Sequence, residues 1–595
     1  MDVLFDKSQN GNDSSYKIPI GTSIAFPEYQ VKIDPDAFFG KHAAIIGSTG
    51  SGKSCTIASI LQSIFSIKEV NNAHFVILDT NGEYSEVFTG LRTPENYLHI
   101  QDLKIPYWFM NFDDFRILFK ASEGTQAPVL RDAILDSRNE RLPVKRYFLE
   151  SRIIESGLGA LSYLVLRTGT QQMHNRRNAA RTISKLIERV KNWEDNSDGS
   201  EEKEALKKLR EELIEMQNKG GIDSSQDQDR IDWDTYKGNM ESDEVDIILR
   251  TADVIRTNLL DELTKTDKGK GYDISVDTPA YFDKSYFRKT GIKKAMEVQP
   301  GAEDRRLAEY CATLLLRIDS YFSDKRYDFL FYEFKQHPHA LASFLRYVLG
   351  RLNRSQENRS HIDEAKAGLP YLEKLHVENK RNYQVTIIDL HLLASEILEN
   401  ITALLGRIIL DFLQRIRGPA EIKNRDEDTI IKLEETRGEF PIVLILEEAQ
   451  NYIKESRSAD IESPSKLVFE RIAREGRKYG LSLVVASQRL SDLSKTVLSQ
   501  CNSFIVHRLQ NPEDLRYFKE VVPAIHSTLL EQLPSLASQT ALILGECVRA
   551  PIHVKVRTAS PKPISKNPEL WKHWTETHPF EPDFEKICDE WEKGL

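Results

Sequence analysis

Short apolar runs bounded by turn residues recur along the chain and alternate with stretches of helical spacing. Runs of this kind, rich in β-branched residues, are typical of buried strands in a mostly parallel sheet, because helices cover both faces of such strands. The pattern therefore predicts an α/β fold. The predicted strands lie at 43–46, 74–79, 383–390, 441–448, 481–488, 503–509, 540–546 and 552–557.

A different pattern fills the region between the second and the third of these strands. Apolar residues there recur at spacings of three and four, which places them on one face of a helix. Two such stretches flank the polar connector NWEDNSDGSEEKE and predict a helical hairpin with a solvated tip. The hairpin is either a solvated face or subunit contact, or an arm that contacts DNA. Its apolar positions are Ile183, Leu186, Val190, Leu206, Leu209, Leu213 and Met216.

These patterns divide the chain into an interrupted core and its additions. Residues 39–110 and 378–557 carry the strands and are predicted to be two parts of one core. The region 111–377 is predicted to be a large all-helical insert. Residues 1–38 hold two short β-like pieces, too few for an independent domain, and 558–595 read as a C-terminal arm that packs on another surface.

The composition is that of a globular protein with ample core, at 40% apolar and 29% charged residues. A net charge of −10 excludes a surface that binds nucleic acid over its whole extent, but not a basic pore. The five cysteines include no CxxC pair, which favours reduced thiols over disulfides or a zinc site. No apolar run approaches the roughly 18 residues of a membrane span, and no signal region is present. We therefore expect a cytoplasmic protein without membrane contact.

The stretch GSTGSGKSC fills the phosphate-loop pattern G-x-x-x-x-G-K-[ST] between a predicted strand and a predicted helix. In such a loop, backbone N–H groups surround phosphate oxygens, Lys53 reaches the β- and γ-phosphates, and Ser54 holds Mg²⁺. The alternative is a glycine-rich turn without a ligand. The predicted cofactors are ATP and Mg²⁺, and the predicted binding residues are Gly47, Ser48, Thr49, Gly50, Ser51, Gly52, Lys53, Ser54 and Cys55.

A strand that ends in two carboxylates, Glu447 and Glu448, supplies the second half of an ATPase site. We assign Glu447 to the Mg²⁺ shell with Ser54, and Glu448 to the attacking water. The alternative is a strand that ends in exposed acids. From Lys53 to Glu448 the separation is 448 − 53 = 395 residues, which implies that the helical region is an insert within one nucleotide fold.

A cationic helix and a neutral amide follow these acids. Arg471, Arg474 and Arg477 are spaced by three and share one side of the predicted helix. Guanidinium groups suit the spread charge of a transferring γ-phosphoryl group, although an isolated basic helix is more often a solvated face. Gln488 ends the next strand, where a γ-phosphate sensor would lie; the alternative is a simple polar strand end.

Five motifs carry a resemblance to a known family: GSTGSGKS, LDTNGEY, VLILEEAQNYI, AREGRKYGLSLVVASQRLSDLSKTVLSQCNSFIVHRL and LPSLASQTALILGECVRAPIHVKV. In this order they resemble the HerA branch of the HerA–FtsK family of hexameric DNA-translocating ATPases. The resemblance implies a RecA-like P-loop core and a homohexamer whose active sites lie between adjacent subunits. It also implies an arginine finger from the Arg474/Arg477 segment of the neighbour, and duplex DNA in the pore.

Two features depart from the family pattern. HerA proteins commonly carry a β-barrel of about a hundred residues before the phosphate loop, and here fewer than forty residues precede it. We therefore interpret the short N-terminal β segment as a reduced barrel. Gln450 stands where the family commonly has a histidine, and an amide cannot relay a proton near neutral pH.

The resemblance implies an ATP-driven double-stranded DNA translocase or helicase. It would act with a nuclease or sirtuin-like effector subunit in anti-phage defence or DNA processing. The alternative is an ATP-gated ring scaffold that activates an effector with little translocation; a third is a pumping ATPase of secretion systems. We name Lys454, Arg457 and Lys466 as candidate DNA contacts, with ordinary surface cations as the alternative.

Overall fold

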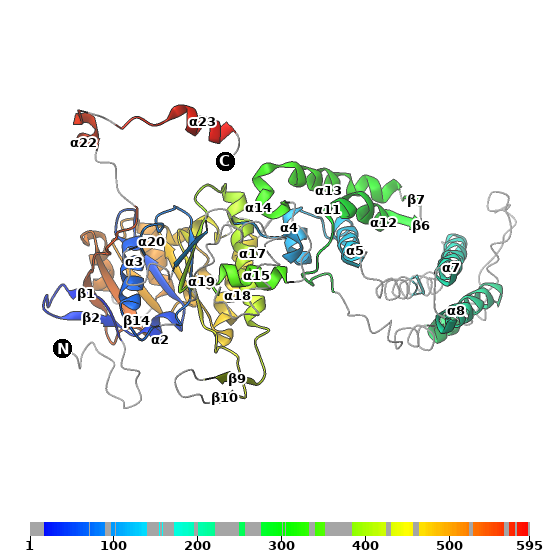
Figure 1. The fold of residues 1–595 in the computed structure, drawn as a ribbon, viewed down its shortest axis with the longest axis horizontal. Helices are drawn as coiled ribbons and strands as arrows, with labels where there is room; N and C mark the ends of the chain where they lie inside the picture. Colours follow the sequence, from blue (N-terminus) through cyan, green and yellow to red (C-terminus); the bar gives the residue numbers. More distant parts are fainter. Residues whose placement is uncertain are drawn as a thin grey trace. The chain divides into compact units, whose positions relative to one another are not determined.

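A computed structural model describes most of the chain (Figure 1). The chain forms two compact units, one made of Met1–Leu118 with Asp319–Leu595 and the other of Phe119–Ile318. The predicted insert, 111–377, is therefore longer at both ends than the second unit. The described residues are 17–70, 72–89, 97–100, 103–139, 154, 157–158, 172–195, 200–219, 249–255, 275–299, 302–303, 305–332, 339–351, 383–423, 430–455, 463–522, 527–564, 570–577 and 580–592.

One eleven-stranded sheet organises the first unit, in the order β2-β1-β15-β14-β13-β3-β12-β11-β4-β8-β5. Every predicted strand is present in it. The strands are β1 (Ile18–Ser23), β2 (Gln30–Ile33), β3 (Ala43–Ile46), β4 (Phe75–Asp79), β5 (Tyr97–Ile100), β8 (Val385–Asp389), β11 (Ile442–Leu446), β12 (Leu481–Ser487), β13 (Ser503–Val506), β14 (Thr540–Gly545) and β15 (Ile552–Val556).

The half of the sheet from β13 to β5 is entirely parallel. All residues of β3, β4, β11 and β12 are buried, as expected for parallel strands that are covered on both faces. The prediction of an α/β fold with a mostly parallel sheet is confirmed. The parallel arrangement matters for function, because the carboxyl ends of all these strands meet at one edge.

The other end of the sheet is antiparallel and includes the N-terminal β segment. β14 and β15 pair with each other, and β1 pairs with β15 on one side and β2 on the other. Ile18, Ile20, Val31 and Ile33 are buried in the same core as β3. Residues 18–33 therefore extend the ATPase sheet.

Helices cover the sheet on both faces. α3 follows the phosphate loop and buries Ile57, Ile60, Leu61 and Ile64 in the core shared with β1, β3 and β4. α17 and α18 pack on each other, and α18 also contacts β12. The main helices of this unit are α2 (Pro35–Phe39), α3 (Lys53–Phe65), α4 (Phe112–Leu118), α14 (Asp328–Phe331), α15 (Ala340–Val348), α17 (Ser395–Leu413), α18 (Pro464–Glu475), α19 (Lys495–Ser499), α20 (Pro512–Val521), α21 (Ser527–Gln532), α22 (Leu570–Thr575) and α23 (Phe584–Glu592).

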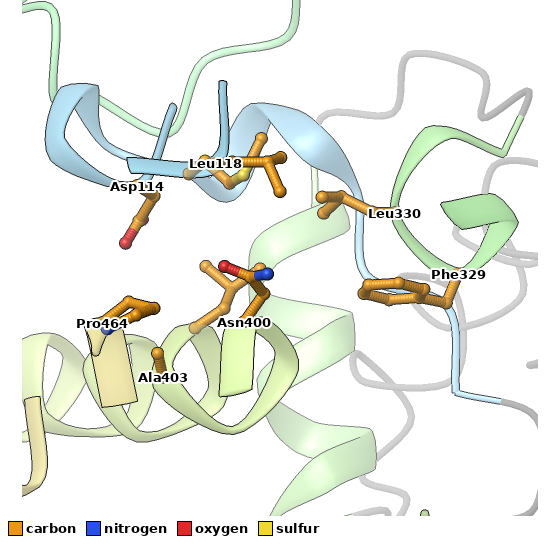
Figure 2. A pocket seen from close by; sticks show the side chains of 9 residues that line it. Asp114, Leu118, Phe329, Leu330, Asn400, Ala403 and Pro464 are labelled. Atoms are coloured by element: carbon orange, nitrogen blue, oxygen red, sulfur yellow. The ribbon is translucent and has the colours of Figure 1, made fainter. Parts of the chain in front are cut away.

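Figure 2 shows a small, mostly apolar cavity between α4 and α17. Asp114 lies at its rim and forms an ion pair with Arg407 of α17 at 2.7 Å. Arg407 also pairs with Asp411 at 2.8 Å and donates to the Phe109 carbonyl at 2.7 Å. Because these contacts join the 109–114 segment to α17, we interpret this place as a structural junction.

The second unit contains the predicted helical hairpin. α7 (Gln172–Asp195) and α8 (Ser200–Lys219) lie antiparallel and bury the predicted apolar positions against each other (Figure 1). A two-stranded sheet of β6 (Glu297–Gln299) and β7 (Ala302–Glu303) also lies here, so the prediction of an all-helical insert is wrong in that detail. The other elements are α5 (Gln126–Asn139), α11 (Lys284–Tyr286), the π-helix η4 (Phe287–Gly291), α12 (Ile292–Met296) and α13 (Arg305–Ser323), which continues past the unit boundary.

Two further hairpin strands, β9 (Ala420–Lys423) and β10 (Ile430–Leu433), pair outside the main sheet. Within the part of the chain that the structure describes, no helix combines the length and the apolar character that a bilayer crossing requires.

Candidate active site

Four connections meet at the carboxyl edge of the parallel strands. The phosphate loop follows β3, the paired acids follow β11, Gln488 follows β12, and the loop 80–84 follows β4. In the sheet order these strands are neighbours, β3-β12-β11-β4. The structure therefore brings together residues that are up to about four hundred positions apart, at the edge where parallel sheets bind ligands.

The phosphate loop takes a conformation that needs its glycines. Gly50 and Gly52 have φ angles of +69° and +112°, which side chains rarely tolerate. A Cβ atom on Gly47 would lie 2.5 Å from Cβ of His507. Lys53 then begins α3 with its side chain only 6% exposed. The structure thus places the predicted loop between β3 and the start of α3, where the N–H groups of the first helical turn have no partner within the helix.

His507 directly follows β13 and packs against the phosphate loop. Sequence patterns did not predict this contact. Nδ1 of His507 lies 2.9 Å from the Thr540 carbonyl, which can only accept, so Nδ1 carries the proton. Nε2 then faces the Thr56 hydroxyl of α3 at 2.9 Å. Burial lowers the pKa of His507 to about 4, so the ring is neutral. The sequence signal was a histidine at the end of an apolar strand.

Glu448 is held from three sides. Its Oε1 lies 3.7 Å from Lys53 Nζ, and both side chains are almost fully buried. The amides of Gln488 and Gln450 donate to its two carboxylate oxygens. Its φ of +44° places a non-glycine residue in the left-handed region, a conformation that persists where the surrounding structure enforces it. The structure thus places Glu448 beside the phosphate loop, and its assignment to the attacking water stays a prediction.

Gln488 also links the acid to the phosphate loop, because its side-chain oxygen accepts a hydrogen bond from the Thr49 hydroxyl. Gln450 has a second contact, in which its side-chain oxygen accepts from the Ser487 hydroxyl at 2.8 Å. Both amides therefore serve as hydrogen-bonding positioners of Glu448, a role that fits the substitution of a titratable histidine by Gln450.

Glu447 is buried, and only one of its two carboxylate oxygens accepts a hydrogen bond. The Tyr84 hydroxyl donates to its Oε1, whereas Oε2 is shielded from solvent without a hydrogen-bond partner. Burial is the main cause that raises the pKa of Glu447 to about 8, and the neighbouring Glu448 charge acts in the same direction. A buried carboxylate oxygen without a partner fits a cation site, as the predicted Mg²⁺ role requires.

The loop after β4 adds residues that the sequence analysis did not assign. Asp79 is fully buried, and its carboxylate accepts the N–H groups of Asn81, Glu83 and Tyr84 at 3.3, 3.1 and 2.9 Å. Gly82, at φ +69°, completes the turn. This fixed loop brings Tyr84 to Glu447 and Glu83 to Ser54. The motif LDTNGEY is present in the sequence, but no short-range sequence pattern indicates which of its acids lies beside the phosphate loop.

Among the described residues, no three acidic, histidine or cysteine side chains gather closely enough to hold a metal by themselves. The donor set around Ser54 therefore fits Mg²⁺ that arrives with nucleotide phosphates, because Mg²⁺ usually takes only one or two carboxylates and completes its shell with phosphate and water.

The predicted arginines lie at the opposite edge of the sheet. Arg474 ends α18 and pairs with Glu470 at 3.7 Å, and Arg477 precedes β12 and donates to Asn502 at 3.3 Å. Both are exposed. The seven residues of β12 separate them from Gln488, a distance of about 20 Å at the usual strand rise. They are therefore not part of the phosphate site of their own chain.

The candidate DNA contacts have different environments. Lys454 is half exposed and pairs with Glu399 at 3.0 Å. Lys466 is 8% exposed and pairs with Glu455 at 3.2 Å, so it offers no free cation at the surface, contrary to its predicted role. Arg457 lies outside the described residues. The DNA contact therefore stays a prediction for Lys454 and Arg457.

Comparisons with known proteins agree with this geometry. The family model DUF87, described as "Helicase HerA, central domain", matches residues 18–249. The DNA double-strand break repair helicase HerA of Saccharolobus solfataricus is 30% identical over 167 residues, which are 28% of this chain and 31% of that protein. A probable helicase of Methanocaldococcus jannaschii is 26% identical over 281 residues, 47% of this chain and 48% of that protein.

The matched segments thus span about a third to a half of the length of these two relatives. The solved structure of the plasmid coupling protein TrwB with ADP and Mg²⁺ overlaps 93% of this chain and 97% of that chain, at 10% identity and a TM-score of 0.31. That score is too low for residues to be matched between the two. The phosphate loop and the paired acids agree with the HerA match, and residues 18–249 of the chain match the central-domain family of the helicase HerA.

Proposed function

We propose that this chain is a Mg²⁺-dependent ATPase that drives translocation on double-stranded DNA. The observation that carries the proposal is the convergence of Lys53 and Glu448, 3.7 Å apart and buried, at the carboxyl edge of a parallel sheet. A lysine at the start of a helix beside a positioned carboxylate is the arrangement that hydrolysis of a nucleoside triphosphate requires.

Each residue of the site has its own role in hydrolysis. Backbone N–H groups of Gly50 and of Gly52–Ser54 bind the β- and γ-phosphates, and Lys53 exchanges its contact with Glu448 for these phosphates. Glu448 is then free to accept a proton from the attacking water, as that water's oxygen bonds to the γ-phosphorus. The bond from phosphorus to the β–γ bridging oxygen breaks, and ADP leaves. Mg²⁺, held by Ser54 and Glu447, would offset the charge on the phosphate oxygens.

Gln488 connects the state of the γ-phosphate to the catalytic acid. Its side chain forms hydrogen bonds with both Thr49 of the phosphate loop and Glu448. A shift of Thr49 would therefore change the position of the Glu448 carboxylate, and the reverse. This double contact supports the predicted sensor role of Gln488.

The proposal includes a homohexameric ring with sites shared between subunits. Its support is the position of Arg474 and Arg477, exposed at the sheet edge opposite to their own phosphate loop. There they are available to the phosphate site of an adjacent subunit, where a guanidinium would offset transition-state charge.

The motif resemblance supports the remaining parts of the proposal: duplex DNA as the track, a nuclease or sirtuin-like effector subunit as partner, and anti-phage defence or DNA processing as the setting. These parts follow from the resemblance to HerA alone.

The ring scaffold is the second candidate, and one observation favours it. Lys53, Gln488 and Gln450 all engage Glu448, and nucleotide phosphates would compete for Lys53, so nucleotide binding would change the contacts of this acid. Such a rearrangement could gate an effector with little translocation.

ATP hydrolysis with and without duplex DNA tests the proposal. We expect DNA to stimulate turnover, Lys53→Ala to abolish nucleotide binding, and Glu448→Gln to bind nucleotide but to turn over about 10²–10⁴-fold more slowly. DNA binding should fall steeply with salt, because phosphate contacts release counterions. Turnover indifferent to duplex DNA would contradict a motor, and effector activity retained by Glu448→Gln would favour the scaffold.

A further inference from the structure

The loop after β4 brings a third carboxylate to the phosphate loop. Burial raises the pKa of the Glu83 carboxyl, and the neighbouring Ser54 hydroxyl acts in the opposite direction, so the two side chains lie close to each other. Oε2 of Glu83 is shielded from solvent and has no hydrogen-bond partner. Ser54 is the residue through which a phosphate loop holds its metal ion. Glu83 thus stands directly beside the predicted metal ligand.

The backbone, and not the Glu83 side chain, fixes this loop. Asp79 accepts the N–H group of Glu83 at 3.1 Å, and the N–H group of Ile564 donates to the Glu83 carbonyl at 2.9 Å. The carboxylate contributes to neither contact. It is therefore free to serve a ligand, while its position is set by main-chain bonds.

Carboxylates outnumber cations at this place. Lys53 faces three carboxylates, those of Glu83, Glu447 and Glu448. Two of these have a buried oxygen without a partner, Oε2 of Glu83 and Oε2 of Glu447, and Glu447 is only 2% exposed. Buried like charges repel one another and lose hydration, so a cation bound here would favour the ionised forms of these acids.

We propose that Glu83 belongs, with Ser54 and Glu447, to the residues that hold Mg²⁺ in the nucleotide site. The inference rests on the proposed function, since it takes nucleotide binding at the phosphate loop as given. It extends the metal site from the strand that carries the paired acids to the neighbouring strand β4.

Binding of a fluorescent, non-hydrolysable ATP analogue, measured in EDTA, in Mg²⁺ and in Mn²⁺, tests this inference without turnover. In Glu83→Gln the metal-dependent gain in affinity should fall at least about 10-fold, the size of effect known for residues around a metal. Affinity in EDTA should stay equal or rise, because one carboxylate fewer repels the phosphates. Mn²⁺ electron paramagnetic resonance on the same complexes should show weaker metal binding.

Two variants complete the design. Glu86→Gln removes the same charge from an exposed position of the same segment and should behave like the unaltered chain. Glu83→Asp keeps the carboxylate and should retain more of the metal-dependent gain than Glu83→Gln. Thermal unfolding of each variant without ligand checks the fold.

The outcomes separate this inference from the proposed function. If the unaltered chain binds no nucleotide, the proposed function fails and this inference fails with it. If the unaltered chain gains affinity with Mg²⁺ and Glu83→Gln gains equally, only the role of Glu83 is overturned. A loss of affinity that is equal in EDTA and in Mg²⁺ would show a structural role instead, and would overturn it too.

Discussion

Glu448 takes a backbone conformation that is rare for a residue with a side chain, and three neighbours hold its carboxylate in place. A strained residue of this kind persists because its surroundings determine it, and such residues concentrate at functional sites. At the scale of single residues, the side chains that hold Glu448 in place are therefore as much a part of the site as Glu448 itself.

Replacing Gln488 by Ala should lower turnover about 10- to 100-fold, in the lower part of the range for a disturbed general base. The reason is that Glu448 loses one of its two amide donors and the Thr49 link is broken. Affinity for nucleotide should change little, because the phosphate loop stays intact. Steady-state hydrolysis and nucleotide titration measure both. Gln510→Ala, exposed after β13, is the control; equal turnover in the two variants would contradict the positioning role.

Arg407 offers a stability test at the same scale. Its 8% exposed guanidinium pairs with Asp114 and Asp411, so Arg407→Ala leaves buried charge without a partner. We expect a loss of about 3–5 kcal/mol of unfolding free energy, measured by urea denaturation.

The control is Arg437→Ala, which breaks an exposed pair with Glu435 and should cost less than about 1 kcal/mol. Combining Arg407→Met with Asp114→Asn should recover part of the loss, because no unpaired charge then lines the cavity in Figure 2. Equal effects of Arg407→Ala and Arg437→Ala would contradict the role of burial.

At the scale of elements, the buried His42, which directly precedes β3, joins this strand to β12 and to helix α18. The N–H group of Leu483 in β12 donates to His42 Nδ1 at 2.9 Å, so the ring proton lies on Nε2, which donates to the Ala473 carbonyl of α18 at 3.0 Å. A protonated ring would lose the first of these bonds. Burial lowers the pKa of His42 from 6.5 to about 4.

This pKa predicts how stability depends on pH. The unfolded chain protonates this histidine near pH 6.5, and the folded chain does so only near pH 4, so the unfolded state binds more protons between these values. Stability is therefore full above pH 6.5 and is lost as the pH falls toward 4, by an amount on the order of 2–3 kcal/mol for this group.

His42→Gln should lower stability at pH 7.5 but should lose less between pH 7 and pH 5 than the unaltered chain, as urea midpoints at several pH values can show. The control is His573→Gln, which changes an exposed histidine of α22. A pH slope that is unchanged in His42→Gln would contradict the assignment.

At the scale of the whole molecule, the two edges of the sheet would carry complementary halves of the site in the proposed hexamer. The phosphate loop lies at one edge, and Arg474 and Arg477 lie exposed at the other. A closed ring of identical subunits repeats one such contact at every interface. The shared site of the proposed hexamer would thus use surfaces that a single chain cannot bring together.

Subunit mixing tests this arrangement. Lys53→Ala and the double variant Arg474→Ala with Arg477→Ala should each lose turnover, the latter by about 10³-fold or more if an arginine finger is lost. A one-to-one mixture should regain activity at about a quarter of its interfaces, where an intact loop faces intact arginines.

The mixing control is Arg471→Ala in place of the double variant, because Arg471 pairs with Glu475 and Asp411 of its own chain. It should keep most of its turnover. Full turnover in the double variant, or a mixture as inactive as its components, would contradict a site shared between subunits.

The local parts of this protein follow from the sequence by itself. The phosphate loop, the strands and the two acids after β11 are encoded within a few residues each, because glycine freedom, apolar runs and strand ends are short-range properties. The antiparallel helical hairpin α7–α8 could be predicted for the same reason, from the spacing of its apolar positions.

Only the tertiary structure decided which of these parts meet. Sheet order places β4 beside β11 and so brings Glu83 and Tyr84 to the acids, and it places His507 under the phosphate loop. It also puts Arg477 at the far edge of the sheet. Strand order and register depend on long-range pairing of nearly uniform apolar strands, which local patterns do not specify.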